Sequence, residues 1–135
     1  MIFQGRIICP NRAEGEALVT SMGISFFGGV DPETGRVVEK GHELEGQIIS
    51  GKILVFPTGK GSTVGSYTLY QLKHAGLAHA AIVNVECETI TAVGCIISEI
   101  PCVDQIPIEN IKTGAKVIVT GDQGTVEVLL QEACN

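Results

Sequence analysis

The sequence contains no tryptophan, and aromatic residues make up only 4% of its 135 residues. Charged residues are also scarce, at 18%, against 44% hydrophobic residues. A chain of this length is expected to fold as one domain, residues 1–135, and to bury about two-thirds of the surface that the unfolded chain exposes. Because so little charge is available to cover its outside, we expect the folded domain to keep a permanent protein partner.

Clusters of basic residues are absent as well. Nine Lys and Arg residues are outnumbered by 15 Asp and Glu residues, which gives a net charge of −6. Nucleic-acid binding requires a concentrated basic surface, so the sequence argues against such a ligand. No apolar run is long enough to span a bilayer, and residues 1–6 lack the features of a signal peptide. We therefore expect a cytoplasmic protein that does not contact membranes.

The five cysteines share no C-x-x-C spacing, and their number is odd. A disulfide framework or a structural zinc site therefore lacks its usual signature. Cys87, Cys95 and Cys102 are spaced loosely enough to meet as thiolate ligands of an iron–sulfur cluster. Cys95 and Cys102 lie in apolar runs, however, where a buried neutral thiol is common, and this second interpretation is favoured.

The pattern of apolar residues predicts a mixed α/β fold. Helices are expected over residues 62–74 and 89–98, with Gly76 ending the first of them. Short strands are expected over residues 4–9, 16–20, 53–56, 80–85, 101–104, 116–120 and 125–130. About seven or eight strands with two helices predict an α/β sandwich.

Three connections between these elements are predicted as well. The strands at 4–9 and 16–20 are separated by a polar segment and suggest a hairpin, and the turn at 121–124 suggests another. The strand at 53–56, the helix after it and the strand at 80–85 predict a βαβ crossover. The strand at 80–85 is nearly all apolar, which is typical of a strand covered on both faces.

Residues 59–66 read G-K-G-S-T-V-G-S and lie between a predicted strand and a predicted helix. Ser62 stands at the expected start of the helix. Unpaired backbone N–H groups and the positive end of the helix dipole favour a carboxylate, phosphate or alkoxide at such a position. Ser and Thr are also ordinary N-caps, and a glycine-rich turn is often only a turn, so both interpretations stand at this level.

Other common motifs do not match. Residues 46–53 have P-loop spacing but carry isoleucine where Ser or Thr is required, and the glycines of 59–65 miss the dinucleotide-binding spacing by one residue. His42, His74 and His79 are scattered and lack the spacing of a hydrolytic triad, which favours packing or surface roles. Nucleotide binding and triad hydrolysis are therefore not supported.

Three segments together resemble the small subunit of the aconitase X family and are closest to its archaeal members, which dehydrate phosphomevalonate. They are residues 27–35 (F-G-G-V-D-P-E-T-G), the turn at 59–66, and A-A-I-V at 80–83 followed by I-P-C-V-D at 100–104. The resemblance spans nearly the whole chain. It implies a swivelling β/β/α three-layer domain, with a mixed sheet and two main helices, that closes over a separate large catalytic subunit.

The resemblance also implies a reaction, the dehydration of (R)-5-phosphomevalonate to trans-anhydromevalonate 5-phosphate in the archaeal mevalonate route to isoprenoids. A 4Fe–4S iron–sulfur cluster on the large subunit would assist departure of the hydroxyl, and this chain would bind no metal. Ser62 matches the base of the family. The further residues expected at the site are Lys60, Gly61 and Thr63 against the substrate, and Gly28, Gly29 and Asp31 at a rim or interface.

Three alternatives stay open at this level. A dehydratase of the same family acts on cis-3-hydroxy-L-proline, which has an amine and no phosphate. A noncatalytic regulatory module would use the turn at 59–66 to bind a phosphorylated ligand without a large subunit. A swivelling phosphotransfer domain normally needs a histidine on its exposed turn, and residues 59–66 contain none.

Overall fold

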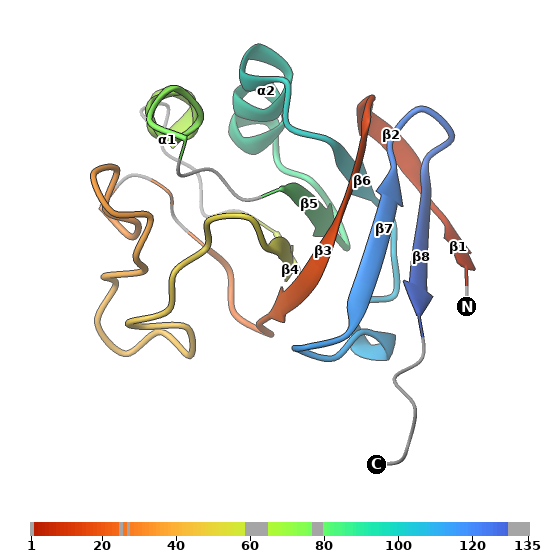
Figure 1. The fold of residues 1–135 in the computed structure, drawn as a ribbon, viewed down its shortest axis with the longest axis horizontal. Helices are drawn as coiled ribbons and strands as arrows, with labels where there is room; N and C mark the ends of the chain where they lie inside the picture. Colours follow the sequence, from red (N-terminus) through yellow and green to blue (C-terminus); the bar gives the residue numbers. More distant parts are fainter. Residues whose placement is uncertain (1, 25, 27, 59–64, 77–79, 130–135) are drawn as a thin grey trace.

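The computed structural model describes residues 2–24, 26, 28–58, 65–76 and 80–129 (Figure 1). Within these residues it contains eight β-strands, two α-helices and one short 3-10 helix. In chain order they are β1 (Ile2–Gln4), β2 (Arg6–Cys9), β3 (Arg12–Val19), β4 (Ile53–Phe56), α1 (Gly65–His74), β5 (Ala81–Asn84), α2 (Thr89–Ser98), β6 (Cys102–Asp104), η1 (Ile108–Asn110), β7 (Lys116–Thr120) and β8 (Thr125–Leu129). The predicted numbers of strands and helices are confirmed within this part of the chain.

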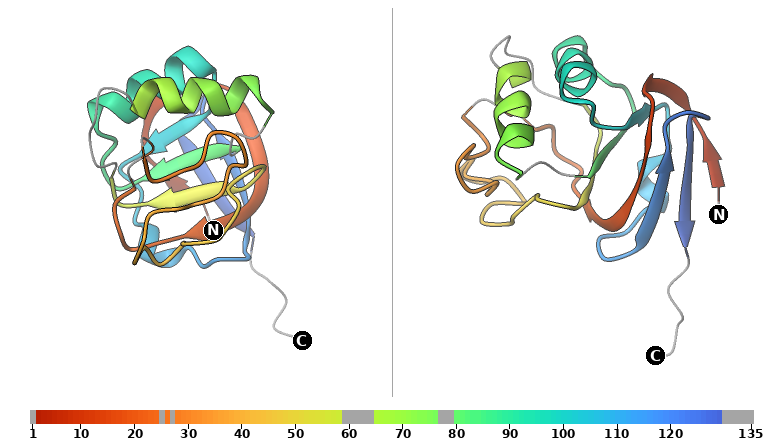
Figure 2. Two further views of the ribbon diagram at one scale, coloured as in Figure 1. Left: turned by 90° about the vertical axis from the view of Figure 1, so that its left-hand side faces the viewer. Right: turned by 45° about the horizontal axis from the view of Figure 1, so that its top comes forward.

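The sheet bends at β3, which changes partner along its length. Its first half, from Arg12 to Glu16, pairs antiparallel with β7, and its second half, from Ala17 to Val19, pairs parallel with β4. The strand order is β1-β8-β7-β3-β4-β5-β6-β2, and β3 therefore carries the sheet from an antiparallel layer into a mainly parallel one (Figure 1). Helices α1 and α2 lie side by side over the outer face of the parallel layer (Figure 2). The β/β/α three-layer arrangement implied by the resemblance is confirmed.

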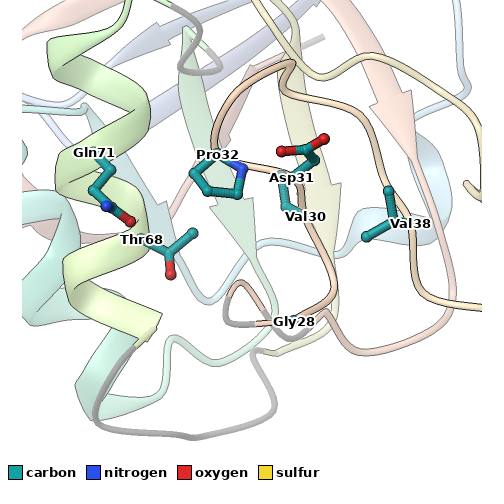
Figure 3. A pocket seen from close by; sticks show the side chains of 7 residues that line it. All are labelled: Gly28, Val30, Asp31, Pro32, Val38, Thr68 and Gln71. Carbon is teal, nitrogen blue, oxygen red and sulfur yellow. The ribbon is translucent and has the colours of Figure 1, made fainter.

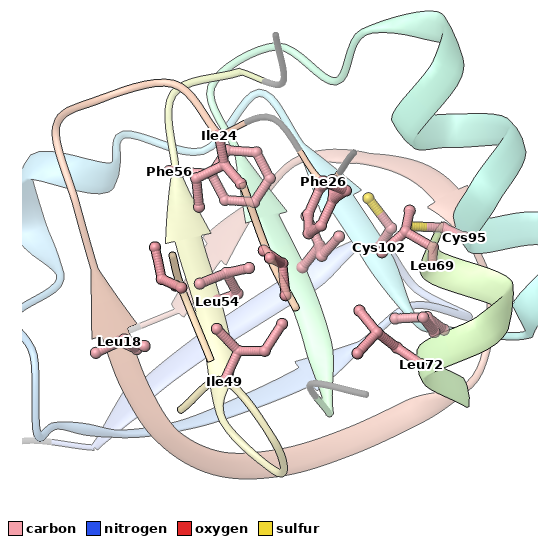
Figure 4. Packing of buried hydrophobic residues seen from close by; sticks show 14 of the residues in the cluster. Leu18, Ile24, Phe26, Ile49, Leu54, Phe56, Leu69, Leu72, Cys95 and Cys102 are labelled. Atoms are coloured by element: carbon pink, nitrogen blue, oxygen red, sulfur yellow. The ribbon is translucent and has the colours of Figure 1, made fainter. Parts of the chain in front are cut away.

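Two apolar cores lie on the two sides of the parallel layer. In β4, Ile53 and Val55 face the core between the two strand layers, whereas Leu54 and Phe56 face the core beneath the helices. Leu69 and Leu72 of α1 close this second core over the strands (Figure 4). All residues of β4 and β5 are buried, which confirms the prediction that a nearly continuous apolar run marks a strand covered on both faces.

Gly5 connects β1 to β2 and so joins the two strand layers along one side. Strands β1 and β2 stand at opposite ends of the strand order, yet only this residue separates them in the sequence. Its backbone N–H donates to Gly124 O at 2.7 Å. A Cβ atom at Gly5 would lie 2.1 Å from Asp104 O and 2.8 Å from a side-chain carbon of Val103, so only glycine fits this corner.

The predicted hairpin between residues 4–9 and 16–20 is wrong. β2 pairs with β6, whereas β3 pairs with β7 and β4. Residues 12–15, expected in a polar turn, form the start of β3, where Arg12, Glu14 and Glu16 are exposed and alternate with half-buried residues. This alternation is that of a strand with one solvated face, and its polar residues were mistaken for a turn.

The other local predictions are confirmed where the structure describes the residues. Helix α2 spans Thr89–Ser98 as expected, and α1 is followed by Gly76 in the left-handed conformation, at φ 73°. Residues 62–64 of the first predicted helix lie outside the described part. The β4–α1–β5 unit joins adjacent parallel strands, and the turn at 121–124 joins β7 and β8. Neither described helix is long and apolar enough to cross a membrane.

The corner at Gly5 generates a test of the fold. We expect Gly5→Ala to lower the free energy of unfolding by about 3 kcal/mol or more, because the new methyl group overlaps a backbone oxygen that cannot move alone. Urea unfolding followed by circular dichroism measures this change.

Gly41→Ala is the matched control. Gly41 has φ 82° and no atom within 4 Å of an added Cβ, so only backbone strain of about 1 kcal/mol is expected. Equal losses in the two variants would contradict the steric account of the corner.

Candidate functional site

A cavity of about 280 Å³ lies between α1 and the loop at residues 28–38. It is lined by Gly28, Val30, Asp31, Pro32, Val38, Thr68 and Gln71 (Figure 3). Thr68 and Gln71 come from α1, and the other five come from the loop. The loop that carries one predicted motif therefore faces the helix that follows the other predicted motif.

Local hydrogen bonds explain the shape of this loop. Asp31 receives the backbone N–H of Gly35 at 2.8 Å on its main-chain oxygen, and that of Glu33 at 2.9 Å on its carboxylate. Asp31 N in turn donates to Arg36 O at 2.9 Å. Gly28 has φ 81°, a backbone conformation that residues with a side chain rarely adopt. The dense run of Gly, Asp and Pro thus forms a tight turn held mainly by its own backbone.

A second hollow, of about 560 Å³, continues along the same helix. It is lined by Pro32, Glu33, Tyr67, Tyr70, Gln71, His74 and Ala75. Pro32 and Gln71 belong to both hollows, so the two form one continuous depression, named here the α1 groove. In it the Tyr70 hydroxyl lies 2.6 Å from His74 Nε2, and the two rings meet edge to face.

The carboxyl ends of the parallel strands carry buried polar groups. Asn84, at the end of β5, is fully buried and donates from Nδ2 to Phe56 O at 2.9 Å. Among the described residues its Oδ1 has no hydrogen-bond partner. Pro57, which follows β4, accepts backbone N–H groups from Val85 and Glu86, each at 3.1 Å. Ligand sites of open α/β sheets form at this edge, and residues 59–66 follow directly from it.

Three of the described cysteines, Cys87, Cys95 and Cys102, lie close together at β6. The sulfur atoms of Cys87 and Cys102 lie 3.8 Å apart. Contact with Cys102 and burial raise the pKa of the Cys87 thiol far above its ordinary value. The Cys87 contact lowers the pKa of Cys102, but its contact with Cys95 and its burial outweigh that effect and raise it.

In the described ranges, no group of three or more His, Cys, Asp and Glu residues is arranged to hold a metal ion. Cys95 and Cys102 are buried, which agrees with the buried-thiol interpretation of these two residues, whereas Cys87 is half-buried.

The predicted site residues divide into two sets. Gly28 and Asp31 line the cavity, and Gly29 lies beside it with its carbonyl accepting the Val38 N–H at 2.9 Å. The remaining four, Lys60, Gly61, Ser62 and Thr63, lie outside the described residues. The structure therefore places Gly28 and Asp31 beside α1. The roles of the residues in the turn at 59–66 stay a prediction.

Sequence reasoning missed the contribution of α1 to the cavity. Thr68 and Gln71 are three residues apart and therefore lie on one face of the helix. They precede the fully buried Leu69 and Leu72 by one residue each. The sequence signal that could have indicated their role is this second, more polar stripe of the same helix.

Two further polar residues have structural roles. His42 is buried, where its Nδ1 accepts the Leu44 N–H at 3.1 Å and its Nε2 lies 3.0 Å from Gly23 O. Glu88 caps α2 by accepting the N–H groups of Ile90 and Thr91. His42 thus has the packing role that the sequence favours.

Comparison with known proteins places this geometry in a family. The family model described as the aconitase X swivel domain matches residues 2–128. The phosphomevalonate dehydratase small subunit of Methanosarcina mazei is 56% identical over 132 residues, which cover 96% of this chain and 92% of that protein. The protein of the same name from Methanocella arvoryzae is 53% identical over 131 residues, covering 95% and 99%.

Solved structures agree with these matches. The crystal structure of Thermococcus kodakaraensis aconitase X in its holo form superposes with a TM-score of 0.94 at 52% identity, covering 96% of this chain and 99% of the matched chain. A second protein, solved in solution by NMR, superposes with a TM-score of 0.89 at 50% identity. With the β/β/α layers and the family match over residues 2–128, these likenesses show that the chain belongs to the aconitase X swivel domain family.

Proposed function

We propose that this chain is the small subunit of a two-chain hydro-lyase that dehydrates (R)-5-phosphomevalonate to trans-anhydromevalonate 5-phosphate, a step of the archaeal mevalonate pathway. The observation that carries the proposal is its similarity to proteins named phosphomevalonate dehydratase small subunit, which extends over 95–96% of the chain in several relatives. A small subunit requires a large one, so the partner is the large catalytic subunit of the same enzyme.

In this proposal Ser62 is the proton acceptor. Its oxygen takes the proton next to the substrate carboxylate, and the electron pair left behind forms the carbon–carbon double bond as the carbon–oxygen bond of the substrate hydroxyl breaks. The hydroxide that leaves takes up one proton to become water, which balances the proton removed by Ser62. The net products are the anhydro acid and one water molecule. Negative charge develops on Ser62 before the transfer and on the carboxylate during it, so the surroundings must stabilise an anion.

Helix α1 supports this assignment. It begins by Gly65, so the positive end of its dipole points toward residues 59–64. The first turn carries no Asp or Glu, whereas Lys73 and His74 stand in the last turn, and this distribution leaves the amino end free for an anion. Lys60, Gly61 and Thr63 bind the substrate beside the base in this proposal, and Gly28, Gly29 and Asp31 form the rim across the cavity.

The iron–sulfur cluster belongs to the large subunit in this proposal, as the resemblance to the aconitase X family implies. This chain then contributes the base and part of the substrate site, as a single swivelling domain of residues 1–135 in the cytoplasm. It closes over the partner to complete the active site.

Substitution of Ser62 tests the mechanism. We expect Ser62→Ala, co-expressed with the large subunit under anaerobic conditions, to lower kcat by about a hundredfold or more because the proton acceptor is lost. The dehydration assay measures this loss. Ser98→Ala is the control, because Ser98 is a buried serine in α2 whose hydroxyl has no hydrogen-bond partner among the described residues. Near-normal turnover by a folded Ser62→Ala complex would show that another group is the base.

The substrate is tested with the wild-type complex. We expect dehydration of (R)-5-phosphomevalonate and no turnover of cis-3-hydroxy-L-proline, because the second compound offers no phosphate to the site. Parallel assays on one preparation measure both. The reverse preference would identify the other dehydratase of the family, and tight binding of the phosphorylated substrate by the isolated chain, with no turnover in the complex, would favour a regulatory module.

The location of the cofactor is tested on the chain alone. Purified anaerobically without its partner, the protein should be colourless and free of iron, since the proposal places the cluster on the large subunit and the described residues include no group arranged to hold a metal ion. Visible absorption and iron analysis measure this. Iron-dependent absorbance in the isolated chain would contradict the assignment of the cluster to the large subunit.

A further inference from the structure

The carboxylate of Asp104 is fully buried at the carboxyl end of β6. It is bound by two nitrogen atoms of Arg6, Nε at 3.0 Å to Oδ1 and Nη2 at 2.6 Å to Oδ2. The two side chains differ sharply in exposure, 53% for Arg6 and 0% for Asp104. The hydrogen bond and charge of Asp104 raise the pKa of Arg6, so the guanidinium keeps its positive charge.

Asp104 also binds the backbone beyond β5. Its Oδ2 accepts the N–H of Cys87 at 2.9 Å, and the next residue, Gln105, donates its own N–H to Val85 O at 2.9 Å. The end of β6 therefore forms hydrogen bonds with both ends of the segment 85–87, at Val85 and at Cys87. Because these residues are not part of a strand or helix, such bonds fix their position.

The same residues hold the end of β4. Val85 and Glu86 both direct their N–H groups to Pro57 O, each at 3.1 Å. Pro57 follows the last residue of β4 and has no N–H of its own, so its carbonyl, which accepts both of these N–H groups, ties it to the segment after β5. A chain of bonds therefore runs from Arg6 through Asp104 and residues 85–87 to Pro57.

We propose that Asp104, oriented by Arg6, is a positioning residue of the dehydratase: it fixes residues 85–87 and, through them, Pro57 at the end of β4. The inference rests on the proposed function, in which Ser62 lies five residues beyond Pro57. A base must be held within a fraction of an ångström of its working position. Loss of this support therefore lowers turnover, although Asp104 itself does not contact the substrate.

A purely structural role explains the pair less well. Well-packed apolar residues often replace a buried ion pair with no loss of stability, so stability alone gives little reason for a charge at this place. The other ion pairs of the described chain differ in kind. Lys52–Glu16 and Arg12–Glu14 are single contacts between exposed or half-exposed side chains, and neither pair includes a buried carboxylate.

Two variants test the inference in the anaerobic two-chain complex. Asp104→Asn keeps the shape but presents one oxygen where Asp104 serves three N–H donors, and it removes the charge. Arg6→Gln changes the half-exposed partner and leaves Asp104 its bond to Cys87, so it provides a second variant should the first fail to fold. We expect kcat to fall about tenfold or more in Asp104→Asn and less in Arg6→Gln, with KM nearly unchanged.

Hydrogen exchange gives a readout that does not depend on activity. In the full isolated chain, the amides of Val85, Glu86 and Cys87 should exchange faster in both variants than in the wild type, while the amides of β7 and β8 keep their protection. Arg6→Lys, which keeps the charge but loses the two-pronged contact, should give intermediate exchange and intermediate kcat.

Val119→Ala controls for general loss of stability. Val119 lies fully buried in β7, in the core between the two strand layers and away from this edge. It should lower the melting temperature and leave kcat unchanged. The inference is overturned if Val119→Ala lowers kcat as much as Asp104→Asn does, or if both Asp104 and Arg6 variants retain wild-type kcat.

Failure of the proposed function is distinguishable from failure of this inference. If the wild-type complex dehydrates neither substrate, the proposed function is wrong, and exchange at Val85 and Glu86 then decides alone. Faster exchange in Asp104→Asn supports the positioning of Pro57 by Asp104, and unchanged exchange overturns it.

Discussion

The change of partner within β3 is the constraint on which the rest of this structure depends. Pairing with β7 over its first half and with β4 over its second half folds one sheet into two layers, with an apolar core between them. Once the sheet has folded, β4 and β5 are covered on both faces, by the second layer and by the helices. Their backbone groups are then paired along their length, and only their ends remain for polar chemistry.

This burial explains why polar side chains concentrate at one edge. Asn84 and Asp104 are both fully buried, and both lie where a parallel strand ends. Each satisfies backbone groups that the sheet can no longer pair, Phe56 O for Asn84 and Cys87 N for Asp104. A polar group without a partner in such a place would cost about 1–3 kcal/mol, so these side chains are tied to the geometry of the edge. The same edge leads into residues 59–66, which links the packing of the fold to the position of its proposed site.

Local sequence patterns predict much of this fold, but they do not predict which strands pair when the strands are far apart in the chain. The β4–α1–β5 unit, α2 and the β7–β8 hairpin follow from apolar periodicity and turn residues within short windows, and they were predicted within a few residues of their bounds. The partner of β2 was missed because β6 lies far away in the chain: Arg6 and Asp104 are 98 positions apart. The cavity was foreseen only in part, since Gly28 and Asp31 belong to a recognisable motif whereas Thr68 and Gln71 are ordinary helical residues. The importance of Asp104 depends on burial and on three donors from two distant segments, which no local pattern contains.

In the proposed function, a base that meets its substrate only when two chains come together places a particular demand on the smaller chain. Docking orients the whole domain, so any freedom of the base relative to that domain is not removed by docking and reduces turnover. The described segments on both sides of residues 59–64 are both held by contacts with the sheet and its core. Leu69 and Leu72 anchor α1 in the core, and the carbonyl of Pro57 is fixed by two donors from the end of β5. The loop at 28–38 is built differently: its turn is closed by its own backbone, and it forms one wall of the α1 groove beside an anchored helix. In the proposed function, the firm support of the segments that flank residues 59–64 lets the sheet position the base, while the separately built loop at 28–38 meets the substrate or the partner independently.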